Sequence, residues 1–109
     1  MLKTKATIEE MGREIADFLS NHVKVDRLIL FGSYSHGKAR KDSDFDIAVI
    51  SEDFERMGVL EKIELFSKAA IMIDSRIELK GFSKQEFLNL EKGSMLELIK
   101  NEGKVIYSG

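Results

Sequence analysis

Residues 32–46 of the chain, GSYSHGKARKDSDFD, carry the pattern that decides the fold. An apolar, strand-like run, VDRLILF at residues 25–31, precedes this stretch, and a second one, DFDIAVI at residues 44–50, overlaps its end. A glycine directly after a buried strand tolerates a positive φ and lets the backbone approach a ligand closely. If a helix begins at Ser33, its free N–H groups form an anion site beside Gly32. The stretch predicts a strand, a ligand-binding turn and a second strand.

Two aspartates in this stretch predict a metal site beside the turn. Asp44 and Asp46 lie two residues apart on the second strand, so both carboxylates leave one face, about 7 Å apart at the backbone. Mg²⁺ takes oxygen ligands and commonly binds one or two carboxylates together with substrate phosphates. Two solvated acids at the start of a strand are the alternative. These acids lead into the apolar run IAVI, however, and charges that enter a core need a partner or a metal.

A calcium-binding EF-hand loop is a competing interpretation of the same acids. Asp42, Asp44 and Asp46 match the first three ligands of such a loop. The loop then needs glycine, where this chain has Ile47, and a bidentate glutamate at the twelfth position, where it has Asp53. These two mismatches favour the strand.

Hydrophobic periodicity predicts a small mixed α/β domain, with helices packed on a short sheet, over residues 1–109. A capping box of Thr7 and Glu10 opens the first helix, which carries Gly12 on its surface. Ser83 and Glu86 form a second capping box. The expected helices cover residues 7–20, 57–72, 84–90 and 95–101, and the expected strands cover 25–31, 44–50, 76–82 and 104–107. The second helix is expected to turn one apolar face to the core, formed by Leu60, Ile63, Phe66, Ala69 and Ala70.

Composition favours a soluble cytoplasmic protein. With 43% hydrophobic and 33% charged residues, the chain has the balance of a globular domain. The net charge of −2 supplies no basic excess for binding long nucleic acid. Cysteine is absent, which excludes disulfides and thiolate metal sites. The basic start is not followed by the apolar core of a signal peptide, and no apolar run approaches the roughly 20 residues of a membrane span.

The Gly32-Ser33 pair and the Asp44-x-Asp46 pattern together closely resemble the signature of the nucleotidyltransferase superfamily. In particular, the chain resembles the minimal nucleotidyltransferases, or MNT proteins, over nearly its whole length. The resemblance implies the nucleotidyltransferase fold, ATP as substrate and two Mg²⁺ ions held by both aspartates and a third carboxylate. In the family, Gly32 and Ser33 hold triphosphate oxygens, and a serine such as Ser43 often precedes the first aspartate.

One residue departs from the family pattern. Many members have arginine before the second glycine, Gly37, where this chain has His36. Histidine is mostly neutral at pH 7 and cannot bind a phosphate through two parallel hydrogen bonds as arginine does. We expect the cations that follow to supply the charge, and a solvated basic loop is the alternative. The expected nucleotide-binding residues are Gly32, Ser33, Gly37, Lys38, Arg40 and Ser43.

The third carboxylate has two candidates, Glu78 within a predicted strand and Asp74 before it. We prefer Glu78, because a rigid strand positions a ligand better than a terminus does. By resemblance, Glu78 would bind metal with Asp44 and Asp46 and help to ionise the attacking hydroxyl. The alternative is an exposed glutamate paired with Arg76 or Lys80.

The resemblance also implies a partner. MNT proteins are commonly encoded beside HEPN-domain proteins and act as antitoxins, and some transfer AMP to a HEPN tyrosine. The chain leaves no room for an acceptor domain, so we expect the acceptor on a partner macromolecule or in a groove shared with another copy of the chain. One alternative is a non-catalytic module that neutralises a HEPN-type partner by contact. Another is a nucleotide-sensing domain without turnover.

Overall fold

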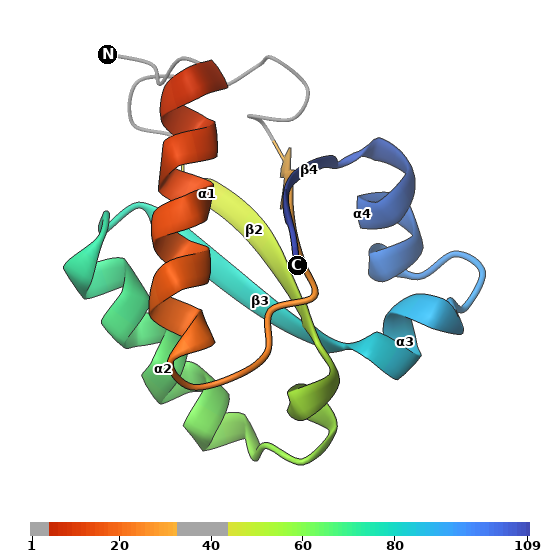
Figure 1. Cartoon of the computed structure of the whole chain (residues 1–109). Helices are drawn as coiled ribbons and strands as arrows, with labels where there is room; N and C mark the ends of the chain where they lie inside the picture. The colour runs from red at the N-terminus through yellow and green to blue at the C-terminus, as the bar shows by residue number, and fades with distance from the viewer. Residues whose placement is uncertain (1–4, 33–43) are drawn as a thin grey trace.

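A computed structural model describes residues 5–32 and 44–109 of the chain. Within them, four strands form one mixed sheet in the order β3-β2-β1-β4 (Figure 1). β1 is antiparallel to β2 and to β4, whereas β3 is parallel to β2. The four strands span β1 (Arg27–Phe31), β2 (Phe45–Ser51), β3 (Ile77–Ser83) and β4 (Lys104–Ser108).

The predicted strands are confirmed, each end falling within two residues of its expected place. β2 occupies the interior of the sheet and β4 an edge. β2 is fully apolar and buried from Ile47 to Ile50, as expected of a strand with neighbours on both sides and helices over both faces. The turn and basic loop expected over residues 33–43 lie outside the described part of the chain.

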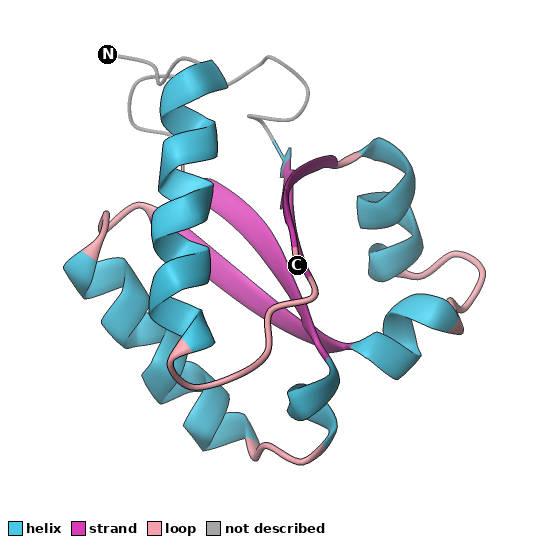
Figure 2. Cartoon of the chain, in the orientation of Figure 1, coloured by secondary structure: helices cyan, strands magenta, loops and turns pink. Residues whose placement is uncertain are grey.

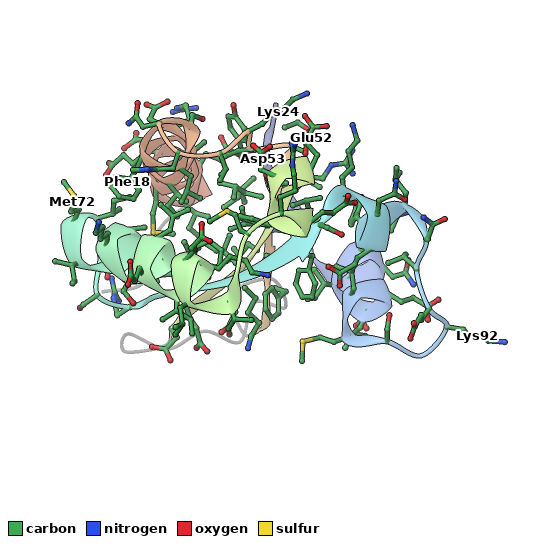
Figure 3. The ribbon with its side chains drawn as sticks, turned by 90° about the horizontal axis from the view of Figure 1, so that it is seen from below. Phe18, Lys24, Glu52, Asp53, Met72 and Lys92 are labelled. Carbon is green, nitrogen blue, oxygen red and sulfur yellow. The ribbon has the colours of Figure 1, made fainter. Side chains whose placement is uncertain are left out.

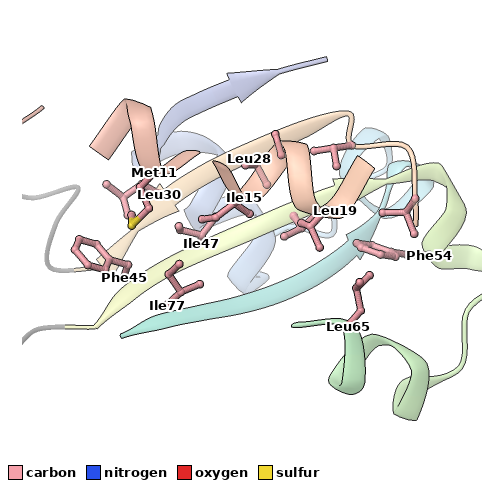
Figure 4. Packing of buried hydrophobic residues seen from close by; sticks show 14 residues of the cluster. Met11, Ile15, Leu19, Leu28, Leu30, Phe45, Ile47, Phe54, Leu65 and Ile77 are labelled. Carbon is pink, nitrogen blue, oxygen red and sulfur yellow. The ribbon is translucent and has the colours of Figure 1, made fainter. Parts of the chain in front are cut away.

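Two long helices cover one face of the sheet (Figure 2). α1 (Lys5–Ser20) and α2 (Val59–Met72) both run across it. Alternate residues of β2 point to this face, so Phe45, Ile47 and Val49 enter the main core. Figure 4 shows Met11, Ile15 and Leu19 of α1 packed over these strands. The buried members of this cluster are Met11, Ile15, Ala16, Leu19, Val23, Val25, Leu28, Leu30, Phe45, Ile47, Val49, Phe54, Leu65 and Ile77.

Two short helices, α3 (Lys84–Leu88) and α4 (Met95–Glu102), pack on the opposite face of the sheet. Phe87, Leu96 and Ile99 from these helices meet the intervening residues of β1 and β2 in a second cluster. The capping box predicted at the start of α3 is confirmed, since Glu86 N donates to Ser83 Oγ at 3.1 Å and Ser83 N donates to Glu86 Oε1 at 3.0 Å. The predicted helix after Ser83 ends at Leu88, two residues early, and a turn at Gly93 (φ 82°) precedes α4.

Two expectations for α1 were wrong. The helix runs from Lys5, so Thr7 lies inside it and not at the predicted first position before it. Gly12 is buried, because β4 packs across this turn, and a Cβ on Gly12 would lie 3.2 Å from Ile106 Cδ1. A glycine here lets the helix and the edge strand approach closely. Periodicity within the helix could not indicate that contact, since Ile106 is far away in sequence.

The predicted inner face of α2 was partly wrong. The helix starts at Val59, two residues later than expected, and Leu60 and Ile63 are 76% and 53% exposed. Leu65 is buried instead, beside Ala69. The cause lies in the segment between β2 and α2, which contains a 3₁₀ helix, η2 (Glu52–Glu55).

η2 brings a phenylalanine into the core that sets the rotation of α2. Phe54 packs edge-on against Phe66, with ring centroids 5.7 Å apart, and is itself buried. η2 is held to the loop after α1, since Lys24 N donates to Asp53 Oδ2 at 2.8 Å and Lys24 Nζ lies 3.4 Å from Glu52 Oε1 (Figure 3).

Among the described helices, none combines the length and apolar character that crossing a membrane requires.

Candidate functional site

Three strand ends bring the predicted site residues together at one end of the sheet (Figure 1). Because β1 is antiparallel to β2, its C-terminal end lies beside the start of β2. β3 is parallel to β2, so it starts at the same end. Gly32 follows β1, and Asp44 directly precedes β2. Asp46 is the second residue of β2, and Glu78 is the second residue of β3. Segments far apart in sequence therefore supply one polar cluster.

The strand register places Asp46 at the centre of this cluster. Asp46 pairs with Phe31 of β1 on one side and with Glu78 of β3 on the other. Paired residues of neighbouring strands direct their side chains to the same face of a sheet. Since Phe45 and Ile47 point into the main core, Asp46 and Glu78 emerge on the opposite face. Asp46 is half-buried there, whereas Asp44 and Glu78 are exposed.

Gly32 packs directly against the Asp46 carboxylate. Its φ of 74° lies in the left-handed region that favours glycine. A Cβ built on Gly32 would stand 2.6 Å from Asp46 Oδ2. The position therefore needs glycine for two reasons, its backbone conformation and the space taken by the carboxylate.

Gly32→Ala should disturb the site more than the fold. The added methyl group displaces the Asp46 carboxylate, and the positive φ adds strain of about 1–2 kcal/mol. We expect ATP binding measured by calorimetry to weaken at least about tenfold, with a modest fall in melting temperature. Gly93→Ala is the control, because Gly93 also has a positive φ but no atom lies within 4 Å of its added Cβ. Equal losses of ATP binding in both variants would contradict a specific role for Gly32.

The carboxyl group of Asp46 is partly buried and lies near two other acidic side chains. Partial burial raises the pKa of its carboxyl group, and the charge of Glu78, a side-chain hydrogen bond with Glu78 and the charge of Asp44 raise it further. Lys80 opposes these effects. Two carboxyl groups in such contact are stable when a proton or a cation compensates their repulsion.

The described carboxylates fit a divalent cation as a partial ligand set. Hard cations prefer the oxygen ligands that Asp46 and Glu78 present side by side, and a cation would relieve the repulsion that raises the pKa of Asp46. Across residues 5–32 and 44–109, no three acidic or histidine side chains already converge closely enough to enclose an ion. Substrate phosphate oxygens commonly complete the coordination of Mg²⁺ in such sites.

Glu78 and Asp74 have different surroundings. Glu78 Oε1 lies 3.9 Å from Lys80 Nζ, a contact between two half-exposed groups that contributes little to stability. Asp74 accepts from Arg76 N at 2.9 Å and from the Arg76 guanidinium at 3.2 Å. Arg76 also stacks over the ring of Phe45 at 4.9 Å and accepts a hydrogen bond from Phe45 N at its carbonyl oxygen. Asp74 thus holds the start of β3 against the start of β2.

The EF-hand interpretation does not fit the structure. Phe45–Ser51 is a strand with partners on both sides, which leaves no loop to wrap around an ion. The remaining predicted nucleotide-binding residues, as well as His36, lie outside the described part of the chain. They are Ser33, Gly37, Lys38, Arg40 and Ser43.

Two of the cavities that the described residues form differ in their distance from the acids. One, of about 460 Å³, is lined by His22, Asp53 and Arg56 among others and lies at the opposite end of β2. The other, of about 200 Å³, includes Gly32 in its wall and therefore adjoins Asp46. Its other lining residues carry no recognisable sequence motif. The sequence signal that could have indicated this cavity is a pair of apolar residues, Met95 and Leu98, which are spaced i and i+3 and lie outside the buried face of α4.

The mixed sheet, its flanking helices and this glycine–carboxylate edge define a nucleotidyltransferase fold. Residues 13–109 match the family model described as polymerase beta, nucleotidyltransferase. The chain belongs to this family.

Its relatives include proteins named for AMP transfer. The chain is 30% identical over 78 residues to a candidate protein adenylyltransferase of Methanocaldococcus jannaschii, covering 72% of this chain and 78% of that protein. It is 39% identical over 59 residues to the protein adenylyltransferase MntA of Shewanella oneidensis, covering 54% of this chain and 41% of MntA.

Solved structures of toxin–antitoxin complexes share the fold. One chain of a toxin–antitoxin complex with AMP-PNP superposes with a TM-score of 0.66 and 28% identity, covering 89% of this chain and 73% of that chain. A chain from the complex of tri-AMPylated Shewanella oneidensis HEPN toxin with MNT antitoxin gives a TM-score of 0.59 and 25% identity, covering 93% and 72%.

Proposed function

We propose that the protein transfers AMP from ATP to a tyrosine hydroxyl of a HEPN-type partner protein and acts as the antitoxin of that pair. The observation that carries the proposal is the alignment of Asp46 with Glu78 on adjacent parallel strands, with the Gly32 backbone against Asp46. This alignment places the acids of the family motif on one face. The names of the relatives support protein as the acceptor class.

In the proposed reaction, the hydroxyl oxygen of the partner attacks the α-phosphorus of ATP. The bond between the α-phosphorus and the bridging oxygen breaks, and pyrophosphate leaves with that oxygen. The hydroxyl proton passes to a carboxylate, for which Glu78 is the candidate. Mg²⁺, held by Asp44, Asp46 and Glu78, would supply charge neutralisation for the phosphates. Since no covalent intermediate is needed, the protein contributes positioning and electrostatic stabilisation.

Gly32 has a separate role in this scheme. A glycine backbone lets phosphate oxygens approach closely, without interference from a side chain. Its contact with Asp46 places any phosphate held there beside the carboxylates. Both halves of the sequence motif would then act on the same triphosphate.

Intact-mass spectrometry of the protein co-expressed with a HEPN-type partner tests the proposal. We expect the co-expressed partner to gain one or more AMP masses. In a separate reaction of the purified proteins with ATP, the partner should gain AMP with Mg²⁺ and none when EDTA replaces Mg²⁺. A stable complex without added mass would instead support an antitoxin that acts by contact alone. That alternative is favoured by His36, which stands where many family members have arginine. Absence of a complex would refute both.

A further inference from the structure

Lys80 of β3 brings a positive charge to the acid cluster. It lies two residues after Glu78 on the same strand, so both side chains leave the same face of the sheet. Lys80 Nζ lies 3.9 Å from Glu78 Oε1. Burial and the charges of Glu78 and Asp44 raise the pKa of the Asp46 carboxyl group, and the charge of Lys80 lowers it. The ammonium group therefore acts on both of the paired acids, Asp46 and Glu78.

The strand register explains how this lysine reaches the acids. Lys80 pairs with Ala48 of β2, and the next pair on the same face is that of the two acids. Ala48 is fully buried, and its methyl group leaves room beside it for the stem of a lysine. Lysine commonly lays its stem along an apolar surface and keeps its charged end in water. The Lys80 side chain is 41% exposed, in agreement with that arrangement.

The contact between Lys80 and Glu78 is weak enough to be exchanged for a stronger one. An ion pair of this length between half-exposed groups contributes little to stability. A divalent cation carries twice the charge of an ammonium group and coordinates carboxylate oxygens directly. The two cations repel each other at such short range, so they compete for the same carboxylates.

We propose that Lys80 is the internal counterion of the metal-free acid cluster, and that a divalent cation displaces its ammonium group from Glu78 on binding. The inference rests on the proposed function, since it takes Asp44, Asp46 and Glu78 as metal ligands. Lys80 is a positioning residue in this role, because it acts through Glu78. The acids alone then bind a divalent cation more weakly than they would without Lys80. The phosphates of ATP, which add ligands and negative charge, favour entry of the cation.

Lys80→Gln tests the proposal, with Lys80→Arg as the conservative variant and Lys68→Gln as the matched control. Lys68 is an exposed lysine of α2 that lines the cavity at the opposite end of β2. Binding of Mn²⁺ without nucleotide is measured by electron paramagnetic resonance, which counts the free ion. Loss of the competing charge should lower the dissociation constant of Mn²⁺ about 5- to 10-fold in Lys80→Gln. Lys80→Arg and Lys68→Gln should bind Mn²⁺ as the wild type does.

The salt dependence of Mn²⁺ binding separates a charge effect from a change of shape. Competition between charges is screened by salt, so the difference between Lys80→Gln and the wild type should narrow as NaCl is raised. The rise in melting temperature on adding Mn²⁺ is a second readout and should be larger for Lys80→Gln.

Equal or weaker Mn²⁺ binding by Lys80→Gln, no detectable binding included, would overturn the role of Lys80 and leave the proposed function intact. Lys80 would then be an ordinary lysine of an edge strand, where charge discourages pairing with other chains. Failure of both proteins to bind Mn²⁺ even with ATP present would refute the metal site, and with it the proposed function and this role of Lys80.

Discussion

Asp46→Asn should lower the rate of AMP transfer by about 100- to 1,000-fold, the range found when one preorganised electrostatic group is removed from an active site. Asp46 is the acid with neighbours on both sides, Phe31 and Glu78 in register and Gly32 against its carboxylate. Asparagine keeps the shape but removes the charge. Transfer is measured as AMP added to the HEPN-type partner over time. Asp17→Asn, the same change on an exposed residue of α1, is the control and should be fully active.

The stability of Asp46→Asn separates a functional acid from a structural one. Burial and the charge of Glu78 raise the pKa of Asp46 in the folded protein. When the pKa of a carboxyl group is higher in the folded than in the unfolded state, protonation of the group stabilises the fold. This contribution is complete below the unfolded-state pKa and is lost as the pH rises through the folded-state pKa. At neutral pH without divalent cations, Asp46→Asn should therefore leave the melting temperature unchanged or raise it, and the difference should vanish in acid. A fall of several degrees at neutral pH would make Asp46 structural.

Glu78→Gln and Asp74→Asn should have opposite effects. Glu78→Gln is expected to reduce AMP transfer by about 100-fold and to leave the melting temperature nearly unchanged, because its contact with Lys80 is long and exposed. Asp74→Asn should keep most of the transfer activity but weaken the partly buried contact with Arg76, costing about 1–3 kcal/mol of folding free energy.

Transfer assays and thermal melts on the same preparations decide between the two acids. Loss of transfer in Asp74→Asn at a temperature where it is fully folded would move the third carboxylate to Asp74. Arg76→Lys is a useful companion to Asp74→Asn, since it keeps the charge but loses the paired hydrogen bonds with the carboxylate. It should share the loss of stability and keep transfer activity.

The sheet and the positions of its acids could be predicted because they depend on local patterns. Apolar runs and their alternation predicted the strands, and a carboxylate at the start of β2 and another within β3 meet when those strands pair in parallel. The preference for Glu78 followed from its place within a rigid strand, and the role of Glu78 as third carboxylate stays a prediction.

The features that the sequence did not predict depend on contacts between distant segments. The buried face of α2 depends on Phe54 of η2, a residue outside the helix. The burial of Gly12 depends on Ile106 of β4. The cavity beside Gly32 requires α4 to lie next to the end of β1, which periodicity in either segment cannot indicate. Propensity and pattern describe each element by itself, whereas these features arise from how the elements pack.

The pairing of β4 with β1 joins two segments from opposite ends of the sequence, Arg27 lying opposite Ser108. Contacts across such sequence separations are slow to form, because a long loop must close before they contribute any free energy. By comparison, β1 and β2 are near neighbours in sequence and can pair early. We therefore expect refolding to produce the β1–β2 pair first and the α4–β4 segment in the slowest phase. ATP with Mg²⁺ present during refolding should leave that rate nearly unchanged and slow unfolding, since it would bind the native state.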